Sequence, residues 1–270
     1  MKKLLLFTLT LGLFAGCKKT EESPAVTTVN IPDKNFEKAL IALKIDSDKT
    51  VNGKLLVSDA EKVYTLDLKN IDDYFVSNII DLTGMEAFKN LSYFRHDGQP
   101  IKRLDFKNNP NLTTIIQLNF LGDTYLDYLD VSNCLNLQTI QVNVSGLALD
   151  FSKHTKLESI IILGNEKKPF TKLTISPSSV LKKLSFGYFT FDTFDFSQLP
   201  NLTFLTAASG NLTSINFSKN TKLEYINIAD NKLTKLDVTM LPLLKTLYCE
   251  NNKLTTVDIS KNPLLKDFSK

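Results

Sequence analysis

The C-terminal half of the chain repeats itself every 21 residues. Leu202, Leu223, Leu244 and Leu265 occupy the same position in consecutive copies. Each copy carries further apolar residues and an Asn at constant offsets, which in one copy are Ile226, Ile228, Asn231, Leu233, Leu236 and Val238. A period of this length is typical of a chain that stacks similar turns into a coil, because one turn cannot bury its apolar face alone.

The upstream copies are less regular than these. Their first leucines are 20 to 25 residues apart, at Leu91, Leu112, Leu137, Leu157 and Leu181. The second half of the unit is clearer, and it recurs eight times in segments such as LDFKNNP, LDVSNCL and VDISKNP. We interpret the longer units as the same turn with small insertions near residues 121–125 and 166–170.

The pattern L-x-x-L-x-L-x-x-N-x-L resembles the leucine-rich-repeat signature. Its last apolar positions alternate with a period of two, which predicts a short strand with those side chains pointing inward. The Asn can bond backbone groups of the turn, and the LDxS-type segments are expected to turn the chain on the far side. The predicted fold is an α/β solenoid, a right-handed coil with a parallel β-sheet on its concave face and a small helical N-terminal cap.

The composition fits such a repeat protein better than an enzyme. The chain has 43 Leu and 23 Asn among 270 residues, but only 2 His and 3 Cys. That leaves little material for a His-based catalytic site or a structural zinc site. A net charge of +3 gives no case for nucleic-acid binding, which needs a clustered basic face.

The N-terminus resembles the signal of bacterial lipoproteins. Two lysines precede an apolar run over residues 4–14, which is too short to span a bilayer, and Ala-Gly-Cys17 follows. The resemblance implies cleavage after residues 1–16, a lipid on the Cys17 sulfur, a fatty acid such as palmitate on the new amine, and anchoring in the outer membrane. The alternative is an ordinary signal peptide with an incidental Cys. Residues 17–29 are polar and are predicted to form a flexible tether.

Residues 30–62 depart from the repeat and are predicted to form a helical cap, with the solenoid over residues 63–270. Asp33 is a plausible N-cap for a helix that contains Phe36 and Leu40. Ser58 and Glu61 have the spacing of a capping box for a second short helix. Residues 62–70 alternate like a strand and are expected to begin the sheet.

With these segments the chain resembles secreted leucine-rich-repeat proteins of Bacteroidetes-type bacteria, whose repeats are similar to internalin repeats. The resemblance covers about residues 29–270 and rests on NIPDKNFEKALIALKIDSD, DLTGMEAFKNL and the repeats themselves. It implies an exported interaction protein, and it brings no catalytic residues and no particular ligand.

One loop has oxygen-bearing residues at alternate positions, as calcium loops do. These residues are Asp46, Asp48, Thr50 and Asn52. Val51 stands where such a loop needs Gly, and Val57 stands where it needs Glu. We therefore expect a capped turn between two helices, with calcium as the alternative and no other cofactor.

The remaining thiols and imidazoles are expected to be structural. Cys249 and His96 fall on inward strand positions, while Cys134 and His154 fall in separate far-side turns, so we expect neither a disulfide nor a Cys–His pair. The Phe-rich run over residues 186–196 is interpreted as core filler rather than a glycan platform. The repeat period places Phe186, Phe191, Phe194 and Phe196 inward.

The concave face is the predicted binding surface. Its exposed strand positions are often apolar or aromatic beside polar groups, which favours contact with a partner. The candidate partner-binding residues are Tyr93, Arg95, Asp97, Ile116, Leu118, Gln141, Asn143, Ile161, Leu163, Phe204, Tyr225, Asn227, Tyr248 and Glu250.

We predict a non-catalytic, monomeric cell-envelope lipoprotein that binds another protein through this face. Adhesion and binding of an envelope partner both fit. The alternative is a surface glycan-binding component that assists a partner enzyme. A third possibility, a hydrolase, has the least support, because no catalytic constellation is present.

Overall fold

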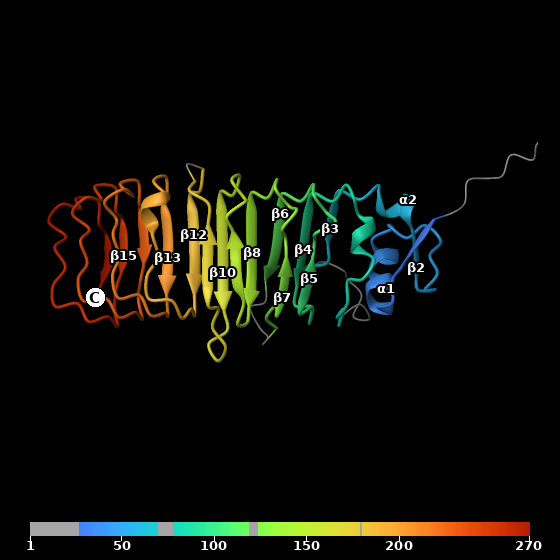
Figure 1. Cartoon of the computed structure of the whole chain (residues 1–270), viewed down its shortest axis with the longest axis horizontal. Helices are drawn as coiled ribbons and strands as arrows, with labels where there is room; N and C mark the ends of the chain where they lie inside the picture. Colours follow the sequence, from blue (N-terminus) through green and yellow to red (C-terminus); the bar gives the residue numbers. More distant parts are fainter. Residues whose placement is uncertain (1–26, 70–77, 119–123, 179) are drawn as a thin grey trace, which may run out of the picture.

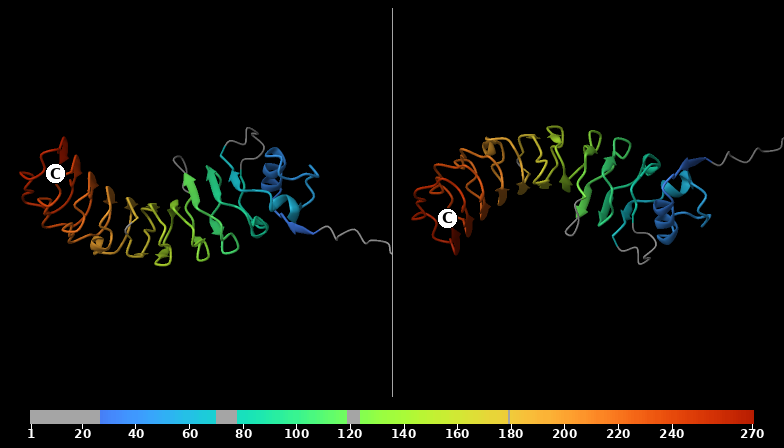
Figure 2. Two further views of the ribbon diagram at one scale, coloured as in Figure 1. Left: turned by 90° about the horizontal axis from the view of Figure 1, so that it is seen from above. Right: turned by 90° about the horizontal axis from the view of Figure 1, so that it is seen from below.

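The computed structural model describes residues 27–69, 78–118, 124–178 and 180–270. These segments form an elongated, curved coil with a small N-terminal region at one end (Figures 1 and 2). The predicted signal, Cys17 and most of the predicted tether lie outside the described residues. Among the helices that are described, none has the length and apolar composition needed to cross a membrane.

The N-terminal region combines a short antiparallel sheet with two α-helices. Its elements are, in order, β1 (Thr28–Asn30), α1 (Lys34–Ala42), β2 (Lys54–Leu56) and α2 (Val57–Ala60). Asp33 caps α1 as predicted, because its Oδ1 accepts hydrogen bonds from the backbone N–H groups of Asn35 and Phe36 at 2.8 and 3.2 Å.

Two details of this region differ from the sequence-based expectation. The capping box was wrong: α2 begins at Val57, so Ser58 lies inside the helix, and the N-cap residue Leu56 makes no side-chain cap hydrogen bond. β1 includes Thr28 and Val29, which we had placed in the tether, because their backbones pair with β2. A polar sequence thus becomes ordered where it completes a sheet.

Ten parallel strands form the main sheet, and one strand comes from each turn of the coil. Figure 2 shows this sheet along the inner, concave side of the curve. In spatial order the strands are β3 (Thr65–Asp67), β4 (Tyr93–Asp97), β6 (Thr114–Leu118), β8 (Thr139–Val144), β10 (Ser159–Gly164), β12 (Lys183–Gly187), β13 (Phe204–Ala208), β14 (Tyr225–Asn227), β15 (Thr246–Tyr248) and β16 (Asp267–Ser269). The predicted first strand, in residues 62–70, is therefore the edge strand β3.

The far side of the coil is built from shorter elements. It contains two parallel pairs, β5 (Arg103–Asp105) with β7 (Tyr128–Asp130), and β9 (Ala148–Phe151) with β11 (Lys172–Ile175). The described residues also contain two 3₁₀ turns, η2 (Met85–Ala87) and η3 (Phe196–Gln198). The described α-helices are confined to the N-terminal region, because a unit of about 21 residues leaves room only for strands and turns between sheet strands.

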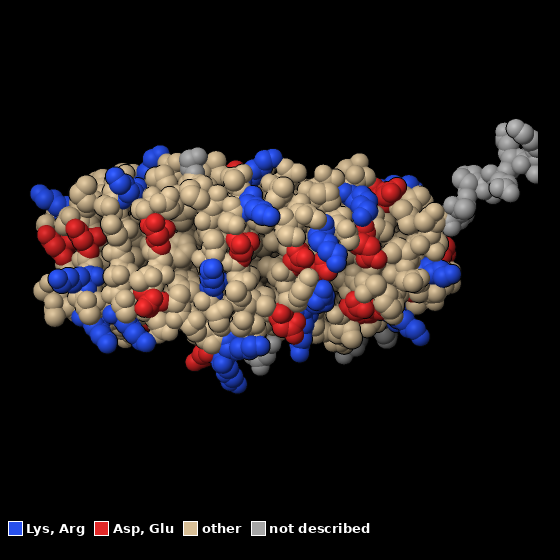
Figure 3. All heavy atoms as spheres, in the orientation of Figure 1, with Lys and Arg blue, Asp and Glu red and all other residues tan. Residues whose placement is uncertain are grey.

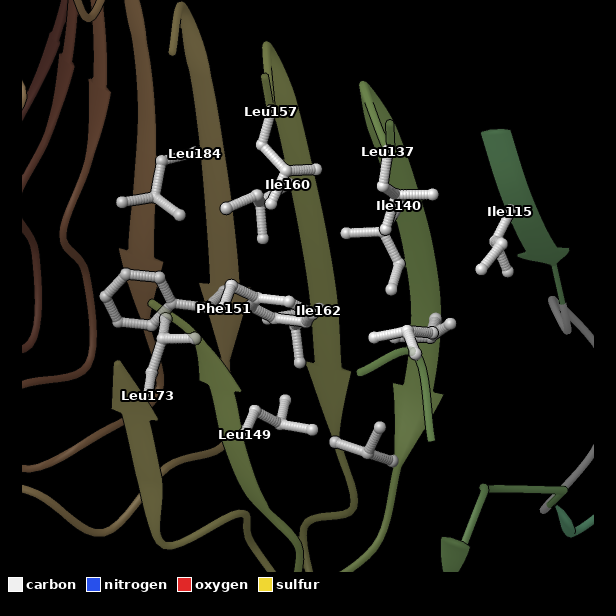
Figure 4. Packing of buried hydrophobic residues seen from close by; sticks show 14 of the residues in the cluster. Ile115, Leu137, Ile140, Leu149, Phe151, Leu157, Ile160, Ile162, Leu173 and Leu184 are labelled. Carbon is white, nitrogen blue, oxygen red and sulfur yellow. The ribbon is translucent and has the colours of Figure 1, made fainter. Parts of the chain in front are cut away.

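The core runs through the whole coil as one cluster. Burial alternates along the strands, so that in β14 Ile226 is buried between half-buried neighbours. Figure 4 shows Leu149 and Phe151 of β9 packing near Ile160 and Ile162 of β10, so the two sides of the coil share one interior. Phe36 and other apolar residues of the N-terminal region belong to the same cluster.

Polar side chains join successive turns at two places. As predicted, the repeat Asn bonds backbone groups: Asn231 Nδ2 donates to the carbonyls of Ala207, Ile228 and Ala229 at 2.7 to 3.1 Å. A second row, which the sequence analysis did not identify, lies in the far-side turns. There the Nδ2 of Asn220 donates to the Phe196 and Leu199 carbonyls of the preceding turn.

Far-side turns follow the LDxS-type segments, as predicted. Where the segment has Asp or Asn at its second position, that side chain accepts a hydrogen bond from the backbone N–H two residues later, for example Asp130 from Ser132 at 3.0 Å and Asp237 from Thr239 at 2.9 Å. These bonds stabilise the charged carboxylate and hold the pKa of Asp130 below its ordinary value, with the Ser132 N–H as the largest cause.

Most of the Phe-rich run is core, with one difference in detail. Phe186 and Phe196 are fully buried, and Phe191 and Phe194 pack partly buried against the core. Phe189, which we had not placed inward, is also buried. It occupies the position of the repeat Asn, 42 residues before Asn231, and its ring fills the space above Gly210.

Candidate functional site

The predicted binding positions lie on the solvent-facing side of the ten-stranded sheet. This side is the concave face of the coil, and it is called the outer face of the sheet below. In β4, β13, β14 and β15 they are half-buried, and they alternate with buried core residues. Ile116, Gln141 and Ile161 are also half-buried, and Leu163 is 39% exposed. Leu118 belongs to β6, but its side chain lies outside the described part of the chain.

Asn143 differs from the prediction, which treated it as exposed. It points to the outer face from β8 but is only 9% exposed. Its backbone N–H donates to Gln117 Oε1 at 3.1 Å.

Three of the predicted residues form an aromatic row, defined here as Phe204, Tyr225 and Tyr248. Phe204 and Tyr225 are direct partners on β13 and β14, and their rings stack 4.3 Å apart with an interplanar angle of 2°. Tyr248 meets Tyr225 at 6.0 Å and 82°, in an edge-to-face contact. Burial by these neighbours raises the pKa of the Tyr225 hydroxyl.

Lys183 extends the aromatic row by one strand. Its Nζ lies over the Phe204 ring, 4.9 Å from the ring centroid, which is a cation–π contact. The sequence analysis missed Lys183, although its position in LKKLSFG matches that of Phe204 and Tyr225 in their own units. The repeat period alone was a sufficient signal.

A hollow of about 290 Å³ lies beside the aromatic row. None of its lining residues is charged; they include Gln141, Ile161, Leu163, Ser185, Gly187 and Ala208. The hollow exists because the neighbours of Leu163 along the outer row are Gly187 and Ala208, whose side chains are absent or small. Sequence reasoning identified Gln141 and Leu163 but not the small residues that form the hollow.

The predicted charges at the N-terminal end of the face pair with one another. The Arg95 guanidinium donates to Asp97 at 2.8 Å, and Lys69 lies 3.8 Å from the same carboxylate. The hydrogen bond with Asp97 raises the pKa of Arg95. At the other end, Glu250 accepts a hydrogen bond from the Ser269 hydroxyl. On the face shown in Figure 3, acidic and basic residues are interspersed, without a continuous patch of either sign.

A larger hollow of about 440 Å³ lies between residues 80–86 and β5. Its charged groups are already engaged: Asp105 pairs with Arg103 and Lys107 at 3.3 and 3.5 Å, and the Arg103 guanidinium covers the Tyr128 ring. This hollow therefore offers fewer free groups to a partner than the hollow on the concave face.

The loop proposed for calcium is held by its own hydrogen bonds. Asp48 accepts from the Thr50 N–H at 2.7 Å and from the Asn52 side chain at 2.8 Å, while the buried Glu37 accepts from the Asn52 backbone N–H at 2.9 Å. Burial and the nearby Asp48 raise the pKa of Asp46. In the part of the chain that the structure describes, no three His, Cys, Asp or Glu side chains converge as a metal site would require. Calcium binding remains a prediction from sequence alone.

The buried thiols and imidazoles are only partly separated: Cys249 and His96 lie on the sheet side of distant turns, whereas Cys134 and His154 occupy the same position in successive far-side turns. Cys134 and Cys249 are buried, free thiols, and burial raises their pKa values to about 12 and 11, which suppresses the reactive thiolate. His154 Nε2 contacts the Val131 carbonyl at 3.0 Å in a far-side turn. His96 points into the core from β4 and is 1% exposed.

Comparison with known proteins supports the fold and goes no further. No protein-family model matches the chain, and no curated protein matches it. The functional domain of InlJ from Listeria monocytogenes, which includes a cysteine ladder, has a TM-score of 0.53 and 24% identity over 90% of this chain and 61% of that one. A chain of the Toll–Spatzle complex of Drosophila has a TM-score of 0.50 and 17% identity over 68% of this chain and 26% of that one.

The chain therefore spans about three fifths of the InlJ domain and a smaller part of the Drosophila protein. The parallel sheet, the stacked turns and these likenesses define a leucine-rich-repeat solenoid of the kind found in internalins.

Proposed function

We propose that this protein is an exported, lipid-anchored, non-catalytic interaction module that binds another protein through the concave face of its solenoid. The aromatic row carries the proposal, because aromatic side chains such as Tyr and Phe are enriched at the centres of protein interfaces. Its likeness to a chain of the Toll–Spatzle complex, in which the solenoid fold takes part in a protein assembly, supports the same reading.

The ring geometry favours a protein over a glycan. A sugar binds an aromatic residue by lying flat on an open ring face. Here Tyr225 covers one face of Phe204 and Lys183 covers the other, while Tyr248 packs against Tyr225. The Phe204 ring therefore presents its edge, and the two tyrosines beside it add hydroxyl groups, which suit the apolar and hydrogen-bonding groups of a protein surface.

Charge substitutions in the aromatic row test this proposal. The double variant Tyr225→Asp/Tyr248→Asp is expected to lose its partner, because two carboxylates replace the apolar centre of the contact. The matched control is Leu135→Asp/Met240→Asp, which places the same charges at apolar residues that are 50% and 54% exposed on far-side turns. Both variants are expected to keep the melting temperature within about 5 °C of the original, because the changed positions are not core.

The measurement is quantitative affinity isolation from the cell envelope of the producing organism. Envelope proteins captured by the original protein and by the control, but not by the Tyr variant, would support the proposal. Equal capture by the Tyr variant would refute the assignment of the face. A glycan array that returns binding to the original protein, with no protein captured, would favour the surface glycan-binding alternative.

A further inference from the structure

The hollow on the concave face has the shape and lining of a socket for one side chain. Its wall is Leu163, 39% exposed, and its floor is formed where Gly187 and Ala208 leave space on the two following strands. We propose that this hollow receives an apolar side chain of the protein partner, and that Lys183 binds a carboxylate of an adjacent acidic residue. This inference rests on the proposed function and names the chemistry of the partner.

The apolar half of the proposal follows from the lining. Leu163 and Ile161 present aliphatic surface to water inside a concavity of about 290 Å³, and no charged group enters it. Water in such a place makes few hydrogen bonds, so an aliphatic or aromatic side chain that displaces it is favoured. Ser185 and Gln141 at the margin can bond the backbone of the partner on either side of that residue.

The acidic half follows from the charges on the same face. Lys183 is two residues from Ser185 on β12 and lies on the same face, so its Cα is about 7 Å along the strand from that of Ser185, which lines the hollow. Arg95 and Lys69 already pair with Asp97. Among the described residues Lys183 has a ring contact but no carboxylate within ion-pair distance. A partner carboxylate can therefore bind it without breaking an existing pair.

Random peptides displayed on phage provide the probe. Selection on the purified protein is expected to enrich peptides with an apolar residue one or two positions from Asp or Glu. Ala208→Leu fills the hollow from a side chain that already points outward, and it is expected to weaken the enriched peptides about tenfold or more. Lys183→Gln is expected to weaken them about two- to fivefold, as the loss of one exposed ion pair would.

Two controls separate these effects from general changes in the face or the charge. Thr114→Leu adds the same side chain on the outer face of β6, away from the hollow, and Lys219→Glu changes charge at an exposed far-side position. Both are expected to bind the peptides unchanged. Selection on Lys183→Glu is expected to replace the acidic consensus by a basic one.

Failure of selection, a consensus without acidic residues, or full binding by Ala208→Leu would each overturn the proposal. If one of these results is obtained while an envelope protein is still captured in a way that depends on Tyr225 and Tyr248, only this inference fails and the proposed function stands. The reverse result, with peptides bound in the hollow and no envelope protein captured, would overturn the proposed function alone.

Discussion

Asn220 shows how a single side chain holds two turns of the coil together. Its Nδ2 donates to the carbonyls of Phe196 and Leu199 at 2.9 and 2.8 Å, and the residue is fully buried. The positions 21 residues before and after it carry Leu199 and Leu241, so the coil tolerates an apolar residue there as well. We expect it not to tolerate a buried acceptor that faces the two carbonyl oxygens and has no proton to donate.

Asn220→Asp is therefore expected to destabilise the protein more than Asn220→Leu. A carboxylate would face two carbonyl oxygens, at a cost of about 3 kcal/mol or more. Leu only removes the Nδ2 donor from carbonyls that keep the backbone N–H groups of Leu199 and Leu202 as partners, and it costs about 1–3 kcal/mol. Urea unfolding of both variants measures the two losses. Equal losses would show that the two hydrogen bonds do not govern this position.

His96 is the residue at which stability depends on pH. Its direct neighbour in the inward row is the buried Gln117, and the later members are Val142, Ile162 and Phe186. Among the described residues neither ring nitrogen of His96 has a hydrogen-bond partner. Burial lowers the pKa of His96 from 6.5 to about 4, with a small opposing effect of Asp97. The folded protein therefore keeps this imidazole neutral at a pH where the unfolded chain protonates it.

The sign of the effect follows from the proton count. Between pH 6.5 and about 4 the unfolded chain binds the proton and the folded protein does not, so stability falls as the pH falls through this window. The full loss is about 3 kcal/mol. His96→Val is expected to remove that loss while other acid effects remain. The unfolding free energy of the variant, relative to that of the original protein, should therefore rise between pH 7 and pH 4. Parallel curves of unfolding free energy would contradict this.

At the scale of elements, the irregular turn between β12 and β13 replaces a hydrogen bond by packing. Phe189 stands at the position of the repeat Asn, and the ring contacts Phe170, Phe186 and Phe191 with centroids 6.1, 5.0 and 4.6 Å away. A Cβ added at Gly210 would come within 2.1 to 2.4 Å of three atoms of that ring. The aromatic turn therefore requires the glycine in the next turn.

Gly210→Ala is expected to cost about 1–3 kcal/mol by forcing the ring from its site. Gly187→Ala is the matched control, because its nearest atom is the Ala208 carbonyl oxygen at 3.3 Å and its cost should be smaller. In Phe189→Leu the penalty of Gly210→Ala should shrink, since the two positions are in contact. Additive losses in the double variant would show that the contact is not the cause.

Elements near the ends of the coil were the hardest to predict. α1 could be predicted from Asp33 and the apolar spacing, because both signals are local. The capping box at Ser58 failed because the same four-residue pattern occurs where β2 runs directly into α2, and strand pairing decides where the helix begins. The far-side row that contains Asn220 was also not predicted. Cys134 and His154 occupy the same position in their own turns, so the residue type varies too much for the row to be recognised from one sequence.

For the whole molecule, each turn is covered by the next. Leu223 and Leu244 are fully buried, whereas Leu265 is half-buried and Phe268 is 41% exposed, because no further turn among the described residues covers them. The charged Lys266 and Asp267 are exposed at this edge and keep the sheet edge polar.

The predicted lipid anchor at Cys17 lies outside the solenoid, and its test uses the whole protein. Cys17→Ser removes the thiol that would receive the lipid, and we expect the protein to move from the membrane pellet to the soluble fraction, because acyl chains rather than charge would hold it. Tyr225→Asp provides the comparison, since it should leave the protein in the pellet. Retention of Cys17→Ser in the pellet would contradict a lipid on Cys17 as the anchor, and finding the original protein in the soluble fraction would point to an ordinary signal peptide. Protease shaving of intact cells would tell surface from periplasm.

Period and residue type by themselves determined the coil, the inward rows, the Asn bonds and the outer positions of the sheet. These depend on spacing along one turn, which a sequence contains. Only the tertiary structure decided that Phe204 and Tyr225 stack, that Asn143 is covered, and that Gly187 and Ala208 open a hollow beside Leu163. Such features depend on the register between neighbouring strands. Because the units vary from 20 to 25 residues, their spacing does not fix which side chains come into contact, and the strand pairing does.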